Sequence, residues 1–331
     1  MAYTTIDDPA QYFNTVTYTG NGASSHAITG VGHQPDFVWI KRRDSAVNHL
    51  LHDSIRGVTK LLVSNTTGAD DVNTNILLGF DSDGFRVGAN SASNVSSGTF
   101  VSWNWKESAT SGFDIISYTG NATGRTISHS LSAVPKWIIV KNRSSSENWI
   151  VYHVSVGNGK RVGLNQTNAE SSTAQSWGGT TPTSSVITLG TSSGTNANGD
   201  DFIMYAFADV KGFSKFGKYS ANNNADGPFV YLGFRPAWLM LKVIDGNTGG
   251  WDMYDSARAA DVIFNNNEEM LQANASALET SNDAVQFLSN GFKIRNTNTT
   301  ANNNGGTYIY MAFAEEPLVA NVGASIPATA R

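Results

Sequence analysis

The chain contains the stretch Pro35-Asp36-Phe37-Val38-Trp39-Ile40-Lys41, which returns as Pro135-Lys136-Trp137-Ile138-Ile139-Val140-Lys141 and as Pro236-Ala237-Trp238-Leu239-Met240-Leu241-Lys242. The three stretches are about one hundred residues apart, and a self-similar period of this size indicates one folding unit used in tandem. Solenoid repeats are usually shorter than this. Each copy is therefore expected to be a small domain with its own core.

Residues far from this stretch keep the same phase. Tyr18-Thr19-Gly20-Asn21 aligns with Tyr118-Thr119-Gly120-Asn121 and, more loosely, with Tyr219-Ser220-Ala221-Asn222. Near the end of each copy an alternating apolar run is followed two residues later by an acid, which is Glu107, Asp209 or Glu315. We therefore divide the chain into an N-terminal arm (1–14), three repeats (15–110, 111–212 and 213–316) and a C-terminal tail (317–331).

Within a copy, short β-type runs recur about every ten residues between turn signals, a pattern typical of an antiparallel sandwich. The run 137–140 is apolar at successive positions, which predicts a strand covered on both faces. Asp-Gly and Asn-Gly pairs in 81–84 and 288–291 predict type I′ hairpins. Short helices are expected only over 8–13, with Asp8 as N-cap, and around 268–278. The predicted fold is all-β, with three tandem antiparallel β-sandwich domains of the jelly-roll or lectin-like kind.

The bulk composition excludes several classes of protein. The 331 residues carry a net charge of −5, and Lys41-Arg42-Arg43 is the densest basic cluster, which argues against nucleic acid binding. The absence of cysteine excludes disulfides and thiolate chemistry. Residues 1–9 lack a basic patch and an apolar core, so no signal peptide is expected, and no run approaches the roughly twenty apolar residues of a membrane span.

Residue types suited to catalysis occur in unsuitable geometry. His52-Asp53-Ser54 contains the three triad residue types, but consecutive strand residues point to opposite faces and cannot relay a proton. Glu107, Asp209 and Glu315 lie one to a copy, whereas glycoside hydrolysis needs two facing carboxylates. A structural role at the strand end is expected for these acids, and no catalytic residue is predicted.

Metal-binding patterns are equally weak, so no metal and no cofactor is expected. His49 and His52 are three residues apart in a β run, which places them on opposite faces of a sheet. The adjacent acids at 70–71 and 200–201 offer oxygen ligands to a cation, but neither pair recurs in all three copies. Two acid–arginine pairs are expected to stabilise turns, weakly if exposed: Asp53 with Arg56, and Asp255 with Arg258.

Candidate surface contacts are Trp177, Asn196 and Asn302. Trp177 lies in a turn-rich stretch without a counterpart in the other copies, so its indole is either exposed as a ligand platform or folded back over the second domain. Asn196 and Asn302 lie in polar loops (191–199 and 296–306) that precede the last strand of their copies. Together with 90–98, these loops are expected to cluster at equivalent ends of the sandwiches, where recognition loops usually lie.

Four segments carry a family resemblance. Gly227–Trp238, Tyr254–Arg258, Phe287–Lys293 and Tyr310–Glu315 resemble a repeat domain of tailed-bacteriophage virion proteins, common in marine phages and tail-fibre-like. The similarity extends over the whole chain, and the third copy is the closest match. The second copy diverges, with His153-Val154-Ser155 where the third has Asp255-Ser256-Ala257. The resemblance implies a role in the virion and no enzymatic activity.

The expected function is therefore a non-enzymatic, surface-exposed virion protein, a tail-fibre or appendage component that contributes to host attachment. It would be assembled in the host cytoplasm and released by lysis. Its expected partners are other virion proteins, further copies of itself (a trimer being the default closed symmetry) and a host surface glycan, but not nucleic acid or membrane. The alternatives are a capsid decoration protein and a glycan-binding module, and an enzyme ranks last.

Overall fold

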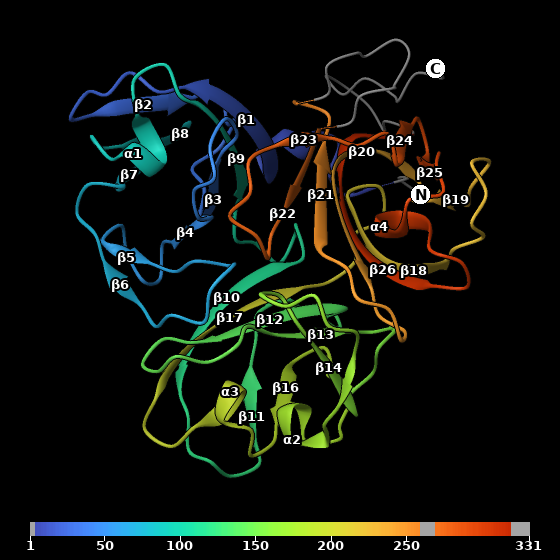
Figure 1. Ribbon diagram of the computed structural model, residues 1–331. Coiled ribbons are helices and arrows are strands. Elements are labelled where there is room, and N and C mark those ends of the chain that lie inside the picture. Colours follow the sequence, from blue (N-terminus) through green and yellow to red (C-terminus); the bar gives the residue numbers. More distant parts are fainter. Residues whose placement is uncertain (1–3, 259–268, 319–331) are drawn as a thin grey trace.

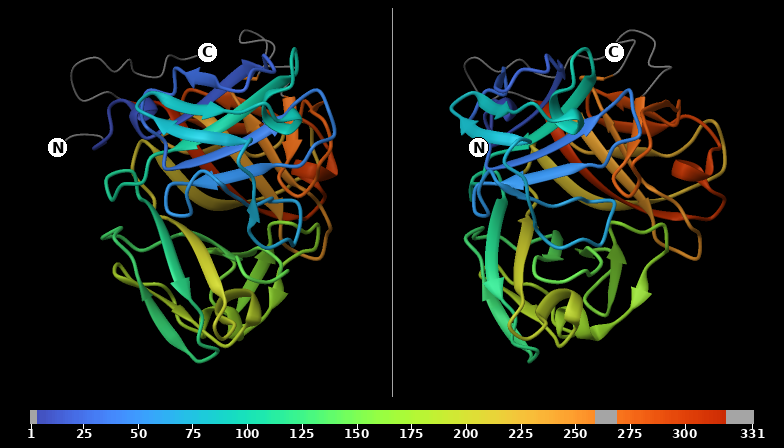
Figure 2. Two further views of the ribbon diagram at one scale, coloured as in Figure 1. Left: turned by 90° about the vertical axis from the view of Figure 1, so that its left-hand side faces the viewer. Right: turned by 60° about the vertical axis from the view of Figure 1, so that its left-hand side comes forward.

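The structure, a computed structural model, describes residues 4–258 and 269–318. Its strands form antiparallel sheets joined by loops and one-turn helices, which confirms the expected all-β class. Figure 1 shows three lobes, one for each repeat, arranged around a common centre. Two rotated views keep this arrangement, with the second repeat (green to yellow) below the other two (Figure 2).

The elements repeat in nearly the same order in the three copies. Copy 1 contains β1 (Phe13–Thr19), β2 (His26–Thr29), β3 (Phe37–Arg42), β4 (Leu50–Asp53), β5 (Lys60–Leu61), β6 (Asp71–Val72), β7 (Leu77–Asp81), β8 (Gly84–Val87), α1 (Ser91–Asn94) and β9 (Thr99–Trp105). Copy 2 contains β10 (Phe113–Thr119), β11 (Arg125–Ser128), β12 (Trp137–Asn142), β13 (Ile150–His153), β14 (Lys160–Gly163), β15 (Ser171–Ser172), α2 (Ala174–Trp177), β16 (Val186–Leu189), α3 (Ser193–Asn196) and β17 (Asp201–Phe207). Copy 3 contains β18 (Ser214–Ser220), β19 (Phe229–Tyr231), β20 (Phe234–Val243), β21 (Trp251–Asp255), β22 (Glu269–Gln272), β23 (Thr280–Ser281), β24 (Val285–Leu288), β25 (Gly291–Ile294), α4 (Thr299–Asn302) and β26 (Thr307–Pro317).

Each copy has the same two-layer plan. The large sheet places the last strand between the first and third, in the orders β1-β9-β3-β4, β10-β17-β12-β13-β14-β15 and β18-β26-β20-β21-β22-β23. A smaller sheet packs on one face of it, as β2-β8-β7, β11-β16 or β19-β25-β24. Each copy thereby encloses an apolar cluster of its own between the two layers.

The other face of every large sheet points to the centre of the molecule. In β12, Ile138 and Val140 belong to the cluster of copy 2, whereas Trp137 and Ile139 belong to a second cluster. This alternation confirms that the strand is covered on both faces, because side chains in a strand point alternately to its two sides. The second cluster contains buried residues from all three copies, including Trp39, Trp137 and Trp238.

Aromatic contacts join the copies within this shared core. The ring centroids of Phe37 and Tyr205 are 4.5 Å apart between copies 1 and 2. Those of Trp137 and Trp251 are 5.8 Å apart between copies 2 and 3. Phe13 and Phe313 stack at 4.9 Å and close the ring between copies 3 and 1. Three separate sandwich domains are therefore not confirmed, because one face of each large sheet is buried against the neighbouring copies.

The predicted N-terminal arm is part of this core. Its short helix is the 3₁₀ turn η1 (Pro9–Gln11), with Asp8 as N-cap and its carboxylate accepting the N–H of Ala10 at 3.2 Å. Ile6 and Phe13 are both buried in the shared core. The arm therefore does not lie outside the repeats, as the sequence division had it. Of the predicted tail, residues 319–331 lie outside the described part of the chain.

Two other local predictions need correction. The helix expected around 268–278 is wrong for the described part, because 269–272 form β22, which pairs with β21 and places Leu271 in the shared core. The predicted hairpins exist, but they are not of type I′, because neither loop has the pair of positive-φ residues that this turn requires. Gly84 and Gly291 instead admit the neighbouring strand, since a Cβ there would lie 2.0 Å from the carbonyl oxygens of Ile28 and Val230.

Candidate functional site

The most elaborate polar clusters of the described residues lie at the joints, that is, at the interfaces between neighbouring copies. Lys41, Lys141 and Lys242 end equivalent strands, and all three are fully buried. Each Nζ donates to backbone carbonyls of its own and of the preceding copy. In the preceding copy, Nζ of Lys41 donates to the carbonyl oxygen of Ser276 at 3.3 Å. Nζ of Lys141 donates to that of Thr67 at 3.1 Å, and Nζ of Lys242 to that of Thr167 at 3.0 Å. Three equivalent lysines thus fasten three equivalent joints, and the chain closes into a ring.

Burial lowers the pKa of each of these lysines to about 8, because an ammonium group loses its hydration in the interior. Backbone pairing follows the same cyclic rule. The N–H groups of Asp70, Glu170 and Glu279 donate to the carbonyl oxygens of Arg143, Ile244 and Arg43. Each joint is therefore made of main-chain contacts that any sequence with this fold could form, reinforced by one buried ammonium group.

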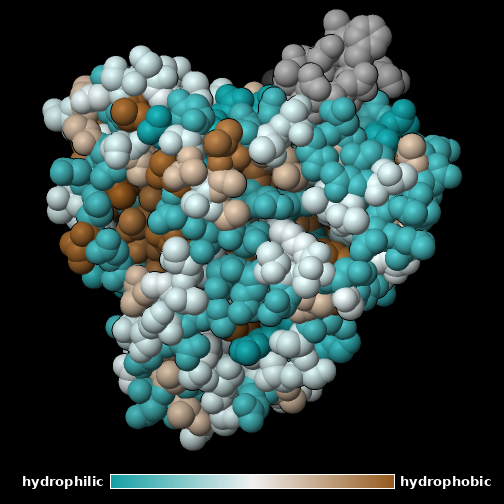
Figure 3. All heavy atoms as spheres, in the orientation of Figure 1, coloured by the Kyte–Doolittle hydropathy of each residue, from teal (hydrophilic) through white to brown (hydrophobic). Residues whose placement is uncertain are grey.

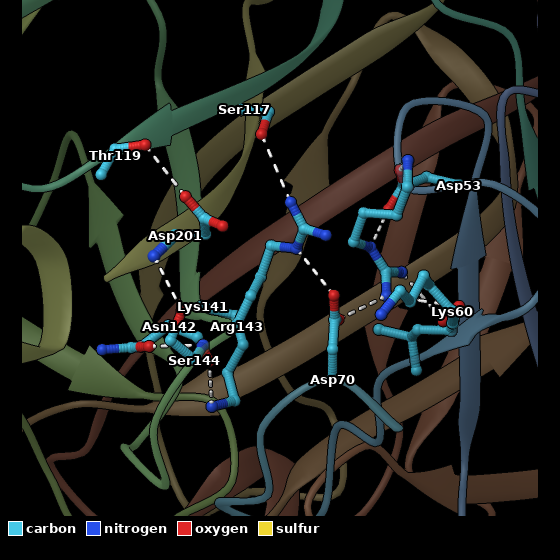
Figure 4. Close-up of polar contacts among 12 residues, drawn as sticks. Asp53, Lys60, Asp70, Ser117, Thr119, Lys141, Asn142, Arg143, Ser144 and Asp201 are labelled. Carbon is cyan, nitrogen blue, oxygen red and sulfur yellow. Dashed lines mark hydrogen bonds and ion pairs between the residues drawn. The ribbon is translucent and has the colours of Figure 1, made fainter. Parts of the chain in front are cut away.

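A buried ion network reinforces the joint between copies 1 and 2 (Figure 4). Asp53 and Arg56 form the predicted ion pair, with 2.5 Å between Oδ2 and Nε, and both side chains are fully buried. The hydroxyl of Tyr205, from copy 2, donates to the same Oδ2 at 2.7 Å. Asp70 bridges Arg56 and Arg143 at 3.1 and 2.8 Å. The pair of Asp53 and Arg56 is not of the weak exposed kind, because both of its side chains are fully buried.

The joint between copies 3 and 1 repeats this arrangement. Asp255 and Arg258 form the equivalent buried pair at 2.6 Å. The indole Nε1 of Trp103, from copy 1, donates to Asp255 Oδ2 at 2.9 Å. Glu279 is the equivalent of Asp70, because its carboxylate forms ion pairs with Arg258 at 2.9 Å and with Arg43 at 2.7 Å.

The joint between copies 2 and 3 has no ion pair at the equivalent positions. His153 and Val156 occupy the positions of Asp53 and Arg56. Burial lowers the pKa of His153 to about 3, so the ring is neutral, and it meets Trp137 edge to face with centroids 5.1 Å apart. One joint therefore lacks the buried acid–arginine pair that the other two have, so the fold does not require that pair at every joint.

The other residues considered for chemistry serve the same interior. His49 accepts the indole N–H of Trp39 at 2.8 Å and packs against Trp103 in the shared core. His52 lies on β4 opposite Val38, whose side chain belongs to the cluster of copy 1, and burial lowers the pKa of His52 to about 3. The described residues contain no group of three or more His, Cys, Asp or Glu side chains arranged to hold a metal ion.

The adjacent acids proposed as cation ligands are occupied by protein donors. Asp70 is bonded to the two arginines described above. Asp200 accepts hydrogen bonds from Asn142 and Ser145 at 2.7 and 2.8 Å, and Asp201 accepts one from Thr119 at 2.9 Å. These carboxylates therefore stabilise loops at the rim of the joint between copies 1 and 2 and within copy 2.

Two of the three acids near the ends of the last strands support the covalent links between copies, whereas Glu315 lies within β26 and pairs with Arg235 at 2.5 Å. Glu107 accepts the N–H of Ile115 at 3.0 Å, and Asp209 accepts that of Phe216 at 3.0 Å. Both bonds reach into the first strand of the next copy, in line with the structural role expected from the sequence. Burial, with Asp114 close by, raises the pKa of Glu107 to about 7.

Trp177 is buried, with 1% of its surface exposed, so it is not a surface contact. Its ring packs edge to face on Tyr152 in the core of copy 2, with centroids 5.6 Å apart. The backbone bond of Gly190 to Ser176 matches those of Gly88 to Ile76 and Arg295 to Ala284, so the position does have counterparts. A turn of helix replaces a strand here, and the indole fills the gap between the two layers.

Asn196 and Asn302 are fully buried and are structural residues, not surface contacts. Asn196 Oδ1 accepts the N–H of Asn121, and its Nδ2 donates to the carbonyl of Thr123. Asn302 makes the same bonds to Asn222 and to the carbonyl of Asn224. The loops at 90–98, 191–199 and 296–306 thus each contain a helical turn whose last residue fixes the bend after the first strand.

The outward side of copy 3 differs from that of the other copies. Phe229 and Tyr231 on β19 are 46% and 50% exposed, the most exposed aromatic side chains among residues 4–258 and 269–318. A pocket of about 580 Å³ adjoins Tyr231, and its lining also includes Asp209, Lys211, Ser214, Lys215 and Leu232. Sequence reasoning missed this place. The signal available was the pair of large side chains at 229 and 231, where the aligned copies have small residues.

The fold and these joints define a class of protein: a pseudo-threefold all-β ring in which three copies share one core. The chain belongs to the family described as a domain of unknown function (DUF7483), whose profile matches residues 8–317, across all three copies. No curated protein matches the chain. No helix in the described residues is long and apolar enough to span a membrane.

Proposed function

We propose that the protein is a non-enzymatic surface component of a tailed-phage particle, in a tail fibre or another appendage, that contributes to host attachment. The observation that carries this proposal is the placement of charge. In the described residues the strongly buried ionisable clusters lie at the joints, where carboxylates meet arginine, tyrosine or indole donors. Such groups stabilise a ring and leave the exterior available for contact.

The exterior supports a role in binding other molecules. The face shown in Figure 3 is mostly hydrophilic, and hydrophobic residues gather over the first copy. Ile55 and Val72 of that copy are 50% and 62% exposed. Exposed apolar groups that the fold does not require are typical of protein contact surfaces. Other virion proteins are the partners proposed for this side of the ring.

Self-association into a homo-oligomer, with a trimer as the default, stays a prediction. The ring gives a single chain an internal threefold arrangement, so a monomer could sit on a threefold axis without further copies. Light scattering on the purified chain would measure its mass and distinguish a monomer from a trimer.

The test of the proposed function is the protein content of purified particles. Particles from a lysate that contains the chain would be separated into heads and tails and analysed by quantitative mass spectrometry. Recovery with the tails, in low copy number per particle, is the expected result. Recovery with the heads, in a number that follows the shell lattice, would favour a capsid decoration protein. Absence from the particles would refute a virion role.

A further inference from the structure

The three copies provide an internal comparison for every surface position. Phe229 pairs across the small sheet with Lys293, as Ala27 does with Arg86. Tyr231 pairs with Gly291, as Thr29 does with Gly84. Copy 2 has Thr126 and Ser128 at these two positions of β11. The central residue between them is apolar and buried in all three copies, as Ile28, Ile127 or Val230.

Large aromatic side chains are therefore not needed for folding at 229 and 231. Two copies form the same strand with small residues at these places. Half-exposed rings contribute only part of the stabilisation of a core ring, because the stabilisation is proportional to the area removed from water. Residues that are spaced by two in a strand point to the same side, about 6.5 Å apart. Phe229 and Tyr231 thus present two neighbouring rings on one outward face.

Positive charge lies beside these rings. Lys215 Nζ lies 5.3 Å from the centroid of the Tyr231 ring and donates to its carbonyl at 2.7 Å. Lys293, opposite Phe229, contacts the exposed Asp226 at 2.6 Å. The pocket contains Lys211 and Lys215 but a single acid, Asp209, which accepts the N–H of Phe216. An ammonium group has three donors, so a lysine with one carbonyl partner can bind a further acceptor.

The corresponding place at the joint between copies 1 and 2 has the opposite character. Asp114 occupies the position of Lys215, is buried, and accepts the N–H of Ser130 at 2.5 Å. Ser128 occupies the position of Tyr231. The combination of aromatic rings, ammonium groups and an open pocket therefore occurs in copy 3 and not at the equivalent place in copy 2.

We infer that this surface, formed by Phe229, Tyr231, Lys215 and the adjoining pocket, binds an anionic saccharide. The apolar face of a sugar ring would stack on the aromatic pair, since flat rings offer contact area at a low entropy cost. A carboxylate or sulfate on the sugar would bind Lys215 by charge-assisted hydrogen bonds. The inference deepens the proposed role in host attachment, because it names the class of ligand.

The test is affinity electrophoresis of the purified full chain in gels containing alginate, polygalacturonate or a sulfated galactan. Dextran is the neutral control, and polyglutamate is the control for charge without sugar. The decisive variant is Phe229→Ala with Tyr231→Thr, which restores the residues of copy 1 and is expected to keep the unfolding temperature. Val134→Thr, at an exposed position of copy 2, is the matched control.

At least one acidic polysaccharide should retard the wild-type chain and Val134→Thr alike, and the double variant should lose that affinity by roughly tenfold or more. The inference is overturned if none of the three retards the wild type, if the double variant is retarded equally, or if dextran or polyglutamate acts as strongly. Binding by a chain that is absent from particles would sustain the inference while refuting the virion role. Presence in particles without polysaccharide binding would sustain the virion role and refute the inference.

Discussion

The buried pair of Asp53 and Arg56 offers the sharpest test of how the ring is held. Replacing Arg56 by valine leaves the Asp53 carboxylate in the interior with the Tyr205 hydroxyl and the N–H of residue 56 as donors, but without a counter-charge. Copy 2 supplies the matched alternative, since it has His153 and Val156 at the same places. The double variant Asp53→His with Arg56→Val therefore installs a solution that this fold already uses.

The expected magnitudes differ for the two variants. Removing one partner of a buried ion pair costs about 3–5 kcal/mol, because the remaining charge is uncompensated. Replacing both partners by residues without charge is far less costly. Asp70 stays paired with Arg143 in both variants. We expect the double variant to be more stable than Arg56→Val by about 1–3 kcal/mol, although it carries one more substitution.

The measurement is the free energy of unfolding from urea denaturation at pH 7, with the unfolding temperature as a second readout. Arg86→Val is the control, because its pair with Asp81 is exposed (46% and 38%) and such pairs contribute about 0–1 kcal/mol. If Arg56→Val costs no more than Arg86→Val, or is as stable as the double variant, the uncompensated-charge reasoning is refuted.

Three further predictions follow from the same interior. Asp252 stands where the aligned copies have Leu50 and Ile150, and burial raises the pKa of its carboxyl to about 7. The folded chain therefore holds this proton more tightly than the unfolded chain, so the free energy of unfolding should fall as pH rises from about 4 to about 7. Calorimetry at pH 5 and pH 8 should show a smaller fall in stability for Asp252→Leu. Copy 2 expressed alone (111–212) should show no cooperative unfolding transition, because its part of the shared core would face water, whereas the full chain should melt in one transition in the same instrument. Deleting residues 1–14 should lower the unfolding temperature of the chain, measured by circular dichroism, because Ile6 and Phe13 fill the shared core; an unchanged temperature would contradict this.

The sequence predicted well whatever depends on local patterns. The period, the all-β class and the short turn after Asp8 follow from spacing, alternation and capping chemistry. The partners in the two acid–arginine pairs were also predicted, because they lie three positions apart across a tight turn. The burial of these pairs was not, since it depends on Tyr205 and Trp103 from the neighbouring copies.

The sequence did not reveal the shared core, although it carried the relevant signal. A strand such as 137–140 was predicted to be covered on both faces, but apolar side chains look the same whether they face their own copy or the next one. The buried asparagines were missed for a related reason. A polar loop residue with three or more internal hydrogen-bond partners has the same composition signal as one that is exposed to water.

The repeats supply a criterion for function that neither composition nor burial provides. Where the three copies agree, as at the joint lysines and the terminal asparagines of the short helices, the shared fold explains the residue. Where they differ in the interior, as at Asp53 and His153, different side chains fill equivalent buried positions. Phe229 and Tyr231 differ from their counterparts on the outside, where no packing problem exists. A difference of that kind is best explained by a ligand, which is why the surface of copy 3 is the first place to test for binding.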